Sequence, residues 1–394
     1  MIAVWLPLLA LFLIRLVPGI AFQSVAVAAP VLMAGLGISH AQVGLLLGGF
    51  MLPGIVVTVP AGLLARHVGD RRVIGGGLLL IVLGAAAASQ VGSVLALLIT
   101  RVLAGLGGPS VLMLLIKMTT DRYGGALLST ALATILAAWP AGLALGLLLL
   151  GPVPAALGWQ ATLGLAAIPA AAALLLLPLI GRAPDAAAVT VAPRTTALPV
   201  VLILAAVLSW SCVNAVLAIV VSFLPGYFVA LGRSVDGAAA ATSVMAWTFA
   251  GALPFGGLLA DLMLGRRVAV IVGCLATAGL LAVVVATGGP LVALFALGLV
   301  FALVPGPLTA QLGQATPPTA RAMVFGWYSA GSYAAMAVAP WAAGWLRDAS
   351  ADARSPLVLA AALILAALVS YAIMDGAATV ARRASYRGAG AARS

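Results

Sequence analysis

Long apolar runs dominate the chain, and short clusters of glycine, proline and charged residues separate them. The runs are continuous, whereas a transmembrane β-barrel would alternate polar and apolar residues, so they predict helices. A membrane-spanning helix needs about 20 apolar residues, and a run of that length is typical here. The breaks predict twelve spans, near residues 5–34, 41–65, 73–90, 94–118, 126–150, 158–180, 198–229, 238–262, 267–287, 290–313, 322–346 and 356–376.

Composition agrees with this pattern. Of the 394 residues, 64% are hydrophobic and 7% charged, and the mean hydropathy is +1.26. Soluble domains have about a quarter of their residues charged, so the chain is expected to be an integral membrane protein. The first apolar run continues past residue 30, which favours a first span over the shorter core of a signal peptide.

One charged, proline-containing interruption, Gly181 to Leu198, separates six spans from six. The sequence therefore predicts an all-α membrane protein of two six-helix bundles. The expected divisions are an N-terminal bundle at 1–181, a cytoplasmic linker at 182–197, a C-terminal bundle at 198–381 and a basic cytoplasmic tail at 382–394. The tail is rich in arginine and small residues, and we expect it to be disordered.

The net charge of +11 is distributed unevenly. With a cytoplasmic N-terminus, the inner loops and tail hold 13 of the 19 Lys and Arg residues, and the outer loops hold only Arg233, Arg347 and Arg354. The positive-inside rule then predicts that both termini are cytoplasmic in a multi-pass cell or inner membrane protein. The basic residues are expected to meet anionic lipid, and no nucleic-acid partner is predicted.

Two predicted loops, separated by about half the length of the chain, have similar sequences. Residues 62–72 read GLLARHVGDRR, and residues 257–267 read GLLADLMLGRR. A repeat at this separation predicts a parallel duplication of a six-helix unit.

These loops resemble the GxxxDxxGRR signature of the major facilitator superfamily. The segment Arg101 to Gly107 is similar to the superfamily's RxxxGxG signature, and Trp139 to Gly146 partly resembles its GPxxGG exchanger motif. The resemblance implies two six-helix bundles that expose a central site alternately to each side of the membrane. It also implies that the repeated loops act as gating contacts between the bundles, through Gly62, Arg66, Asp70, Arg71, Gly257, Asp261 and Arg266. In the superfamily the Asp of this signature takes part in a contact that latches the two bundles together. In the first copy Arg66 stands where the signature has Asp, and Asp70 stands where it has Arg, which puts the N-terminal latch in doubt.

A narrower resemblance is to the cyanate-porter group of that superfamily. It is carried by Arg15-Leu-Val-Pro18, by the stretch from Ile38 through Gly44, by the end of span four at Lys117, and by Gly158-Trp159-Gln160. Membership would imply small anions or small polar organic molecules as substrates.

Two arginines lie deep in apolar spans. Arg15 and Arg101 each fall about eight residues into a span, or ~12 Å from a membrane surface. An ionisable residue at this depth is costly and is a functional candidate. Lys117 lies at a span end, four residues before Asp121, and can reach the interface. The chain has no Glu, and its eight Asp residues lie in loops or at span ends.

A core with fixed cations and no acids favours an anionic substrate, because the arginine fork matches carboxylates and similar anions. Arg15 and Arg101 are therefore candidate substrate-binding residues, and so are Asn214, Trp139, Trp247 and Tyr328 in cavity-forming spans. For each a structural role is the alternative: the arginines could satisfy backbone carbonyls, and the others could pack between helices. Five prolines inside spans are expected to mark kinks: Pro53, Pro140, Pro254, Pro305 and Pro340.

The sequence has no phosphate-binding loop, metal-ligand cluster or nucleophile motif, so an enzyme, a cofactor and a metal site are not predicted. The predicted function is transport of a small anion or small polar metabolite by alternating access, through facilitated diffusion or exchange as an antiporter, by a monomer. The alternative is a proton-coupled efflux pump for drugs or hydrophobic metabolites, which the tryptophan-bearing spans and the partial exchanger motif favour. A non-transporting sensor on the same fold is a third class.

Overall fold

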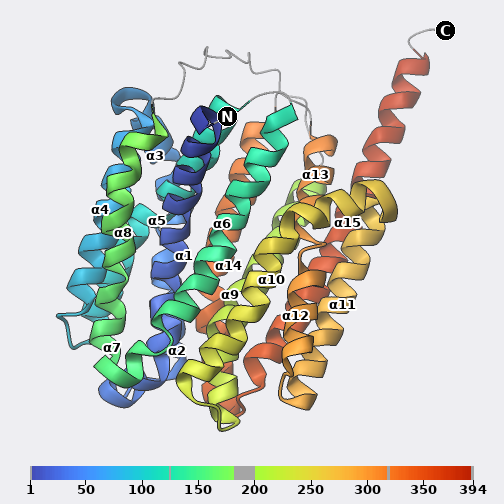
Figure 1. The fold of residues 1–394 in the computed structure, drawn as a ribbon. Helices are drawn as coiled ribbons and strands as arrows, with labels where there is room; N and C mark the ends of the chain where they lie inside the picture. Colours follow the sequence, from blue (N-terminus) through green and yellow to red (C-terminus); the bar gives the residue numbers. More distant parts are fainter. Residues whose placement is uncertain (1, 124–125, 182–199, 317–319, 392–394) are drawn as a thin grey trace.

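The computed structural model describes residues 2–123, 126–181, 200–316 and 320–391. In these ranges the chain is helical with short connections and contains no strand. The helices cross the molecule twelve times, which confirms the predicted fold class (Figure 1).

The first six passes are formed by eight α-helices and one 3₁₀ turn. Passes two and six are each interrupted by a break. The bounds are α1 Ile2–Leu36, α2 His40–Met51, α3 Gly54–Val68, α4 Asp70–Ala88, α5 Val94–Arg122, α6 Ala126–Leu150, α7 Val153–Leu165, α8 Ala167–Leu176 and η1 Leu177–Ile180.

The last six passes repeat this plan, with a π-helical end to pass eight and a break in pass ten. The bounds are α9 Val200–Ala230, α10 Val235–Leu259, η2 Ala260–Leu264, α11 Arg266–Thr287, α12 Leu291–Phe301, α13 Pro305–Ala315, α14 Arg321–Ser350 and α15 Ser355–Ala391. The tail that was expected to be disordered continues α15 as far as Ala391, in a segment rich in the helix formers Ala and Arg. The predicted linker at 182–197 lies outside the described residues.

Two of the five predicted kinks coincide with breaks between helices. Pro53 separates α2 from α3, and Pro305 begins α13. A proline has no N–H to donate to the preceding turn, so a helix can end there. Pro140, Pro254 and Pro340 instead lie inside continuous helices.

Eleven of the helical passes are long and apolar enough to cross a membrane. The remaining pass, α14, has 30 residues and is rich in Ala, Gly and Ser. Its length is sufficient for a span, but its composition is less apolar.

The first and last helices both have their free ends at the same end of the molecule (Figure 1). We call this the terminal end, and we call the opposite end, where α1 turns into α2 and α14 into α15, the distal end. Residues Ile180 and Val200, which flank the predicted linker, also lie at the terminal end because the number of intervening passes is even.

Helices α1–α8 pack mainly on one another, as do helices α9–α15. The two groups meet mainly where α2 and α3 pack on α14, α6 on α10, and α1 on α9. One apolar cluster at this interface joins α1, α6 and α10 and contains Leu147 of α6 and Ala239 of α10. In the described part of the chain, the hydrogen bonds between the two groups lie in the distal half, at Gln23, His40 and Ala41. The bundles are therefore closed against each other at the distal end.

Candidate functional site

Arg15 is buried in the middle of α1, with 5% of its surface exposed. One nitrogen of its guanidinium group donates to the backbone carbonyl of Leu112 in α5, and its Nε has no hydrogen-bond partner. Within the described residues, no carboxylate lies within salt-bridge distance of this cation. A buried guanidinium group with unused donors is a candidate anion site, since burial without a partner is costly.

Arg101 is equally buried, at 4% exposed, but its donors are occupied. From α5 it donates to the carbonyl of Leu46 at 3.3 Å, of Ala21 at 3.0 Å and of Phe22 at 3.5 Å. Its guanidinium carbon also lies 4.8 Å from the centre of the Phe50 ring, a cation–π arrangement. Arg101 thus ties α1 and α2 to α5.

Two aromatic side chains of the C-terminal helices, Trp210 and Phe325, pack on Tyr328. The Trp210 and Tyr328 rings stack at 4.9 Å with an angle of 8° between their planes, and Phe325 meets Tyr328 edge-on. The Tyr328 hydroxyl lies 3.2 Å from that of Thr309. One turn after Trp210, Asn214 donates to the Trp210 carbonyl at 2.9 Å, which leaves its amide oxygen free to accept. The structure therefore brings Asn214 and Tyr328 into one region around Trp210.

Tyr333 is a residue that the sequence reasoning missed. It lies in α14, and its ring lies beside Gly54 of α3 and next to α5, the helix whose Leu112 carbonyl accepts from Arg15. A methyl group added to Gly54 would touch both the Tyr333 ring and Pro109, one turn before Leu112. No motif marks Tyr333; the available signal was a tyrosine in the least apolar span.

The two candidate tryptophans, Trp139 and Trp247, have different surroundings. Trp139 is half-buried and packs on Phe22 of α1 at 5.9 Å between ring centres. Trp247 has 40% of its surface exposed. The structure gives Trp139 a packing contact and leaves Trp247 largely on the surface of α10.

The partial exchanger motif in α6 forms a helix contact. A methyl group on Gly142 would overlap the carbonyl of Leu16, and one on Gly146 would meet Gln23 and Ile20. These glycines let α1 and α6 approach to backbone contact. The motif therefore positions α1, the helix that carries Arg15.

The first repeated loop forms its ion pairs inside the N-terminal group of helices. Lys117 donates to Asp70 at 2.8 Å and to Asp121 at 2.9 Å, so Asp70 joins α4 to α5. The side chains of Arg66 and Arg71 form no ion pair within the described residues, and Gly62 faces Met113. The gating role of these residues stays a prediction.

The second repeated loop is also paired internally. Arg266 donates to Asp261 at 2.5 Å, and nothing lies within 4 Å of a methyl group placed on Gly257. A cavity of about 280 Å³ lies beside this loop at the terminal end, lined by Arg266, Arg267, Gln311, Gln314, Ala315, Met374, Asp375 and Ala378. Because the bundles are closed at the distal end, a latch between them at the terminal end is expected to be open.

The sequence matches the family model of the Major Facilitator Superfamily twice, over residues 11–234 and 203–391. The chain belongs to the Major Facilitator Superfamily. The first match extends through α9 and overlaps the second over residues 203–234. The duplication of a six-helix unit and the division near residues 182–197 therefore stay predictions. The narrower likeness to the cyanate-porter group stays a prediction.

Solved structures of other transporters share the fold of this superfamily member. A bacterial homolog of the human lysosomal transporter Spinster, in an inward-facing and occupied conformation, has 17% identity and a TM-score of 0.70, covering 96% of both chains. A point mutant of the nucleoside transporter NupG has 14% identity and a TM-score of 0.75, covering 93% of this chain and 99% of its own. A D-xylose–proton symporter has 18% identity and a TM-score of 0.73, covering 91% and 96%. No curated protein sequence matches the chain.

Proposed function

We propose that this transporter carries a small anion or small polar metabolite, and that Arg15 contacts the cargo directly. The observation that carries the proposal is the contrast between the two buried arginines. Arg101 donates to three carbonyls, whereas Arg15 donates to one and keeps donors unused. An anion bound at Arg15 would complete hydrogen bonds that the protein leaves unmade.

Two further polar groups of the C-terminal bundle support a polar cargo. The Tyr333 hydroxyl, whose ring lies beside Gly54 and Pro109 of the other bundle, can donate to an anion, and the free amide oxygen of Asn214 can accept from a polar cargo. Near Arg15 the spans supply no acid, so a bound anion would meet no fixed negative charge. We propose that the cargo exchanges by rocking of the two bundles, with the terminal end cytoplasmic as the Lys and Arg distribution predicts.

The test uses the purified protein in liposomes, with counterflow of radiolabelled formate, acetate and lactate recorded together with internal pH. Arg15→Gln should reduce anion counterflow at least about tenfold, equivalent to ~1.4 kcal/mol of lost interaction. Arg15→Lys keeps the charge but loses the fork, so we expect a smaller loss.

Arg233→Gln is the matched control. Arg233 also donates to carbonyls, those of Gly288 and Gly289, but it lies half-buried in the distal connection between α9 and α10, far along the chain from the spans that carry Arg15 and Arg101. It should transport as the unchanged protein does. Full counterflow in Arg15→Gln would refute the role of Arg15. Proton movement triggered by lipophilic cations, without anion counterflow, would instead support a proton-coupled exporter.

A further inference from the structure

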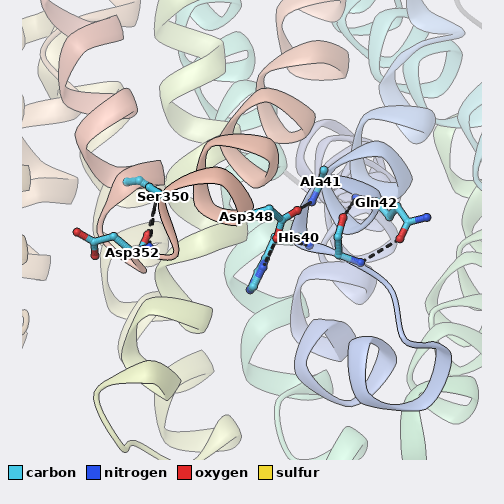
Figure 2. Close-up of polar contacts among 8 residues, drawn as sticks. His40, Ala41, Gln42, Asp348, Ser350 and Asp352 are labelled. Atoms are coloured by element: carbon cyan, nitrogen blue, oxygen red, sulfur yellow. Dashed lines mark hydrogen bonds and ion pairs between the residues drawn. The ribbon is translucent and has the colours of Figure 1, made fainter.

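The first turn of α2 lies against the last turn of α14 at the distal end (Figure 2). The first four N–H groups of any helix have no partner within the helix. In α2, two of them are satisfied locally. Ser39 N donates to the Gln42 side chain at 2.9 Å, and Gln42 N donates to the Ser39 hydroxyl at 3.3 Å, which is a capping box.

The other two N–H groups find their acceptor in the opposite bundle. His40 N donates to one carboxylate oxygen of Asp348 at 3.1 Å, and Ala41 N donates to the other at 2.8 Å. The His40 ring nitrogen Nδ1 also lies 2.7 Å from the first oxygen. A carboxylate at a helix N-terminus is further stabilised by the helix dipole. The cap of α2 is therefore complete only while α14 is in contact with it.

A second contact of the same kind lies deeper, between α1 and α9. In a regular helix the Val221 carbonyl would accept from the N–H of residue 225, but that residue is a proline and has none. The amide of Gln23 donates to this carbonyl at 2.7 Å, and Gln23 is fully buried. One bundle thus supplies the donor that a proline removed from the other.

Small residues allow these polar groups to meet. A methyl group on Gly44, Gly48 or Gly344 would overlap a backbone carbonyl of the facing helix. Helices α2 and α14 are thus in backbone contact, and side chains as short as aspartate can reach the neighbouring main chain.

We infer that Asp348 and Gln23 are positioning residues of a distal gate, and that their bonds to backbone groups of the opposite bundle favour the distally closed conformation. Opening the distal end removes the acceptor of His40 N and Ala41 N and the donor to Val221. This inference goes beyond the proposed function, because it holds for any cargo and depends only on the rocking of the two bundles.

The test measures the width of the distal end directly. The full chain, with Cys212 and Cys274 replaced by Ala, carries spin labels at Gln90→Cys and Val292→Cys, two exposed distal positions in opposite bundles. Pulsed electron paramagnetic resonance in lipid nanodiscs then gives the populations of short and long label distances.

Asp348→Ala should raise the ratio of open to closed distal ends about tenfold, and Asp348→Asn, which retains one acceptor oxygen, should raise it less. The matched control is Asp352→Ala. Asp352 is an exposed carboxylate at the same end, but it accepts from Arg354 N at 2.9 Å within its own bundle. An unchanged distribution in Asp348→Ala, or an equal shift in Asp352→Ala, would overturn the inference for Asp348.

A double-mutant cycle tests Gln23. Gln23→Leu should shift the distribution toward the open form, while Pro225→Ala gives Val221 a donor within α9. In the Pro225→Ala background, Gln23→Leu should therefore shift the distribution several-fold less. Equal shifts of Gln23→Leu in the two backgrounds would show that the Val221 bond has no part in the gate.

Discussion

Replacing Gly48 by Ala tests the backbone contact between α2 and α14 without removing a hydrogen-bond partner. The added methyl group would overlap the carbonyl oxygen of Ala337. Carbon and oxygen atoms that are not bonded do not approach much below ~3.3 Å, so the two helices must separate by roughly 1 Å. We expect the substitution to open the distal end.

The magnitude follows from the cost of overpacking. An extra methyl group in a filled interface typically costs ~1–3 kcal/mol. This cost applies only while the distal end is closed, so it should multiply the ratio of open to closed forms by about 5 to 150. The gain in helix propensity from Gly to Ala, about 1 kcal/mol, applies equally to both forms and leaves their ratio unchanged.

The label pair at residues 90 and 292 measures this ratio. Gly251→Ala in α10 is the matched control, since nothing lies within 4 Å of a methyl group there and the propensity gain is the same. Only Gly48→Ala should lengthen the distal distance. If Gly48→Ala keeps the short distance while remaining monodisperse, α2 and α14 can adapt without separating, and the reasoning fails.

Two further predictions concern stability. Arg101→Gln should lower the thermal unfolding temperature more than Arg15→Gln, because it removes three hydrogen bonds to carbonyls and an aromatic contact, whereas Arg15→Gln removes one such hydrogen bond. The free energies of unfolding of the two variants, measured in detergent, should differ by ~2 kcal/mol. Equal losses would contradict this prediction. Lys117→Met should destabilise the protein by ~1 kcal/mol, because it leaves Asp70 and Asp121 without their shared cation, and Lys117→Arg should restore most of the loss in the same assay.

The fold could be predicted in detail because the bilayer imposes one pattern on every span. The predicted span at 94–118 corresponds to Val94–Arg122, and that at 322–346 to Arg321–Ser350. Breaks were harder to place. Pro53 interrupts its pass, whereas Pro140 does not, because neighbouring helices decide whether a freed carbonyl can be accommodated within a continuous helix.

The candidate site could be predicted only as a set of residue types. Arg15 and Arg101 have the same depth and the same apolar surroundings in the sequence, and only their partners differ. Those partners are backbone carbonyls of other helices, up to 97 residues away. Every residue has a backbone carbonyl, so the sequence does not indicate which of them will accept from an arginine. The bond from Gln23 to Val221, across 198 residues, was unpredictable for the same reason.

The low hydropathy of α14 and the distal gate have a common physical cause. A lipid-facing helix benefits from bulky apolar side chains, but a helix that must close against a neighbour and separate again needs small residues that permit backbone contact. In α14, Gly344 and the backbone at Ala337 meet α2 directly, and Asp348 caps it. Large side chains would widen this contact beyond the reach of an aspartate. The composition that makes α14 the weakest span by hydropathy is therefore the composition that a closing interface requires.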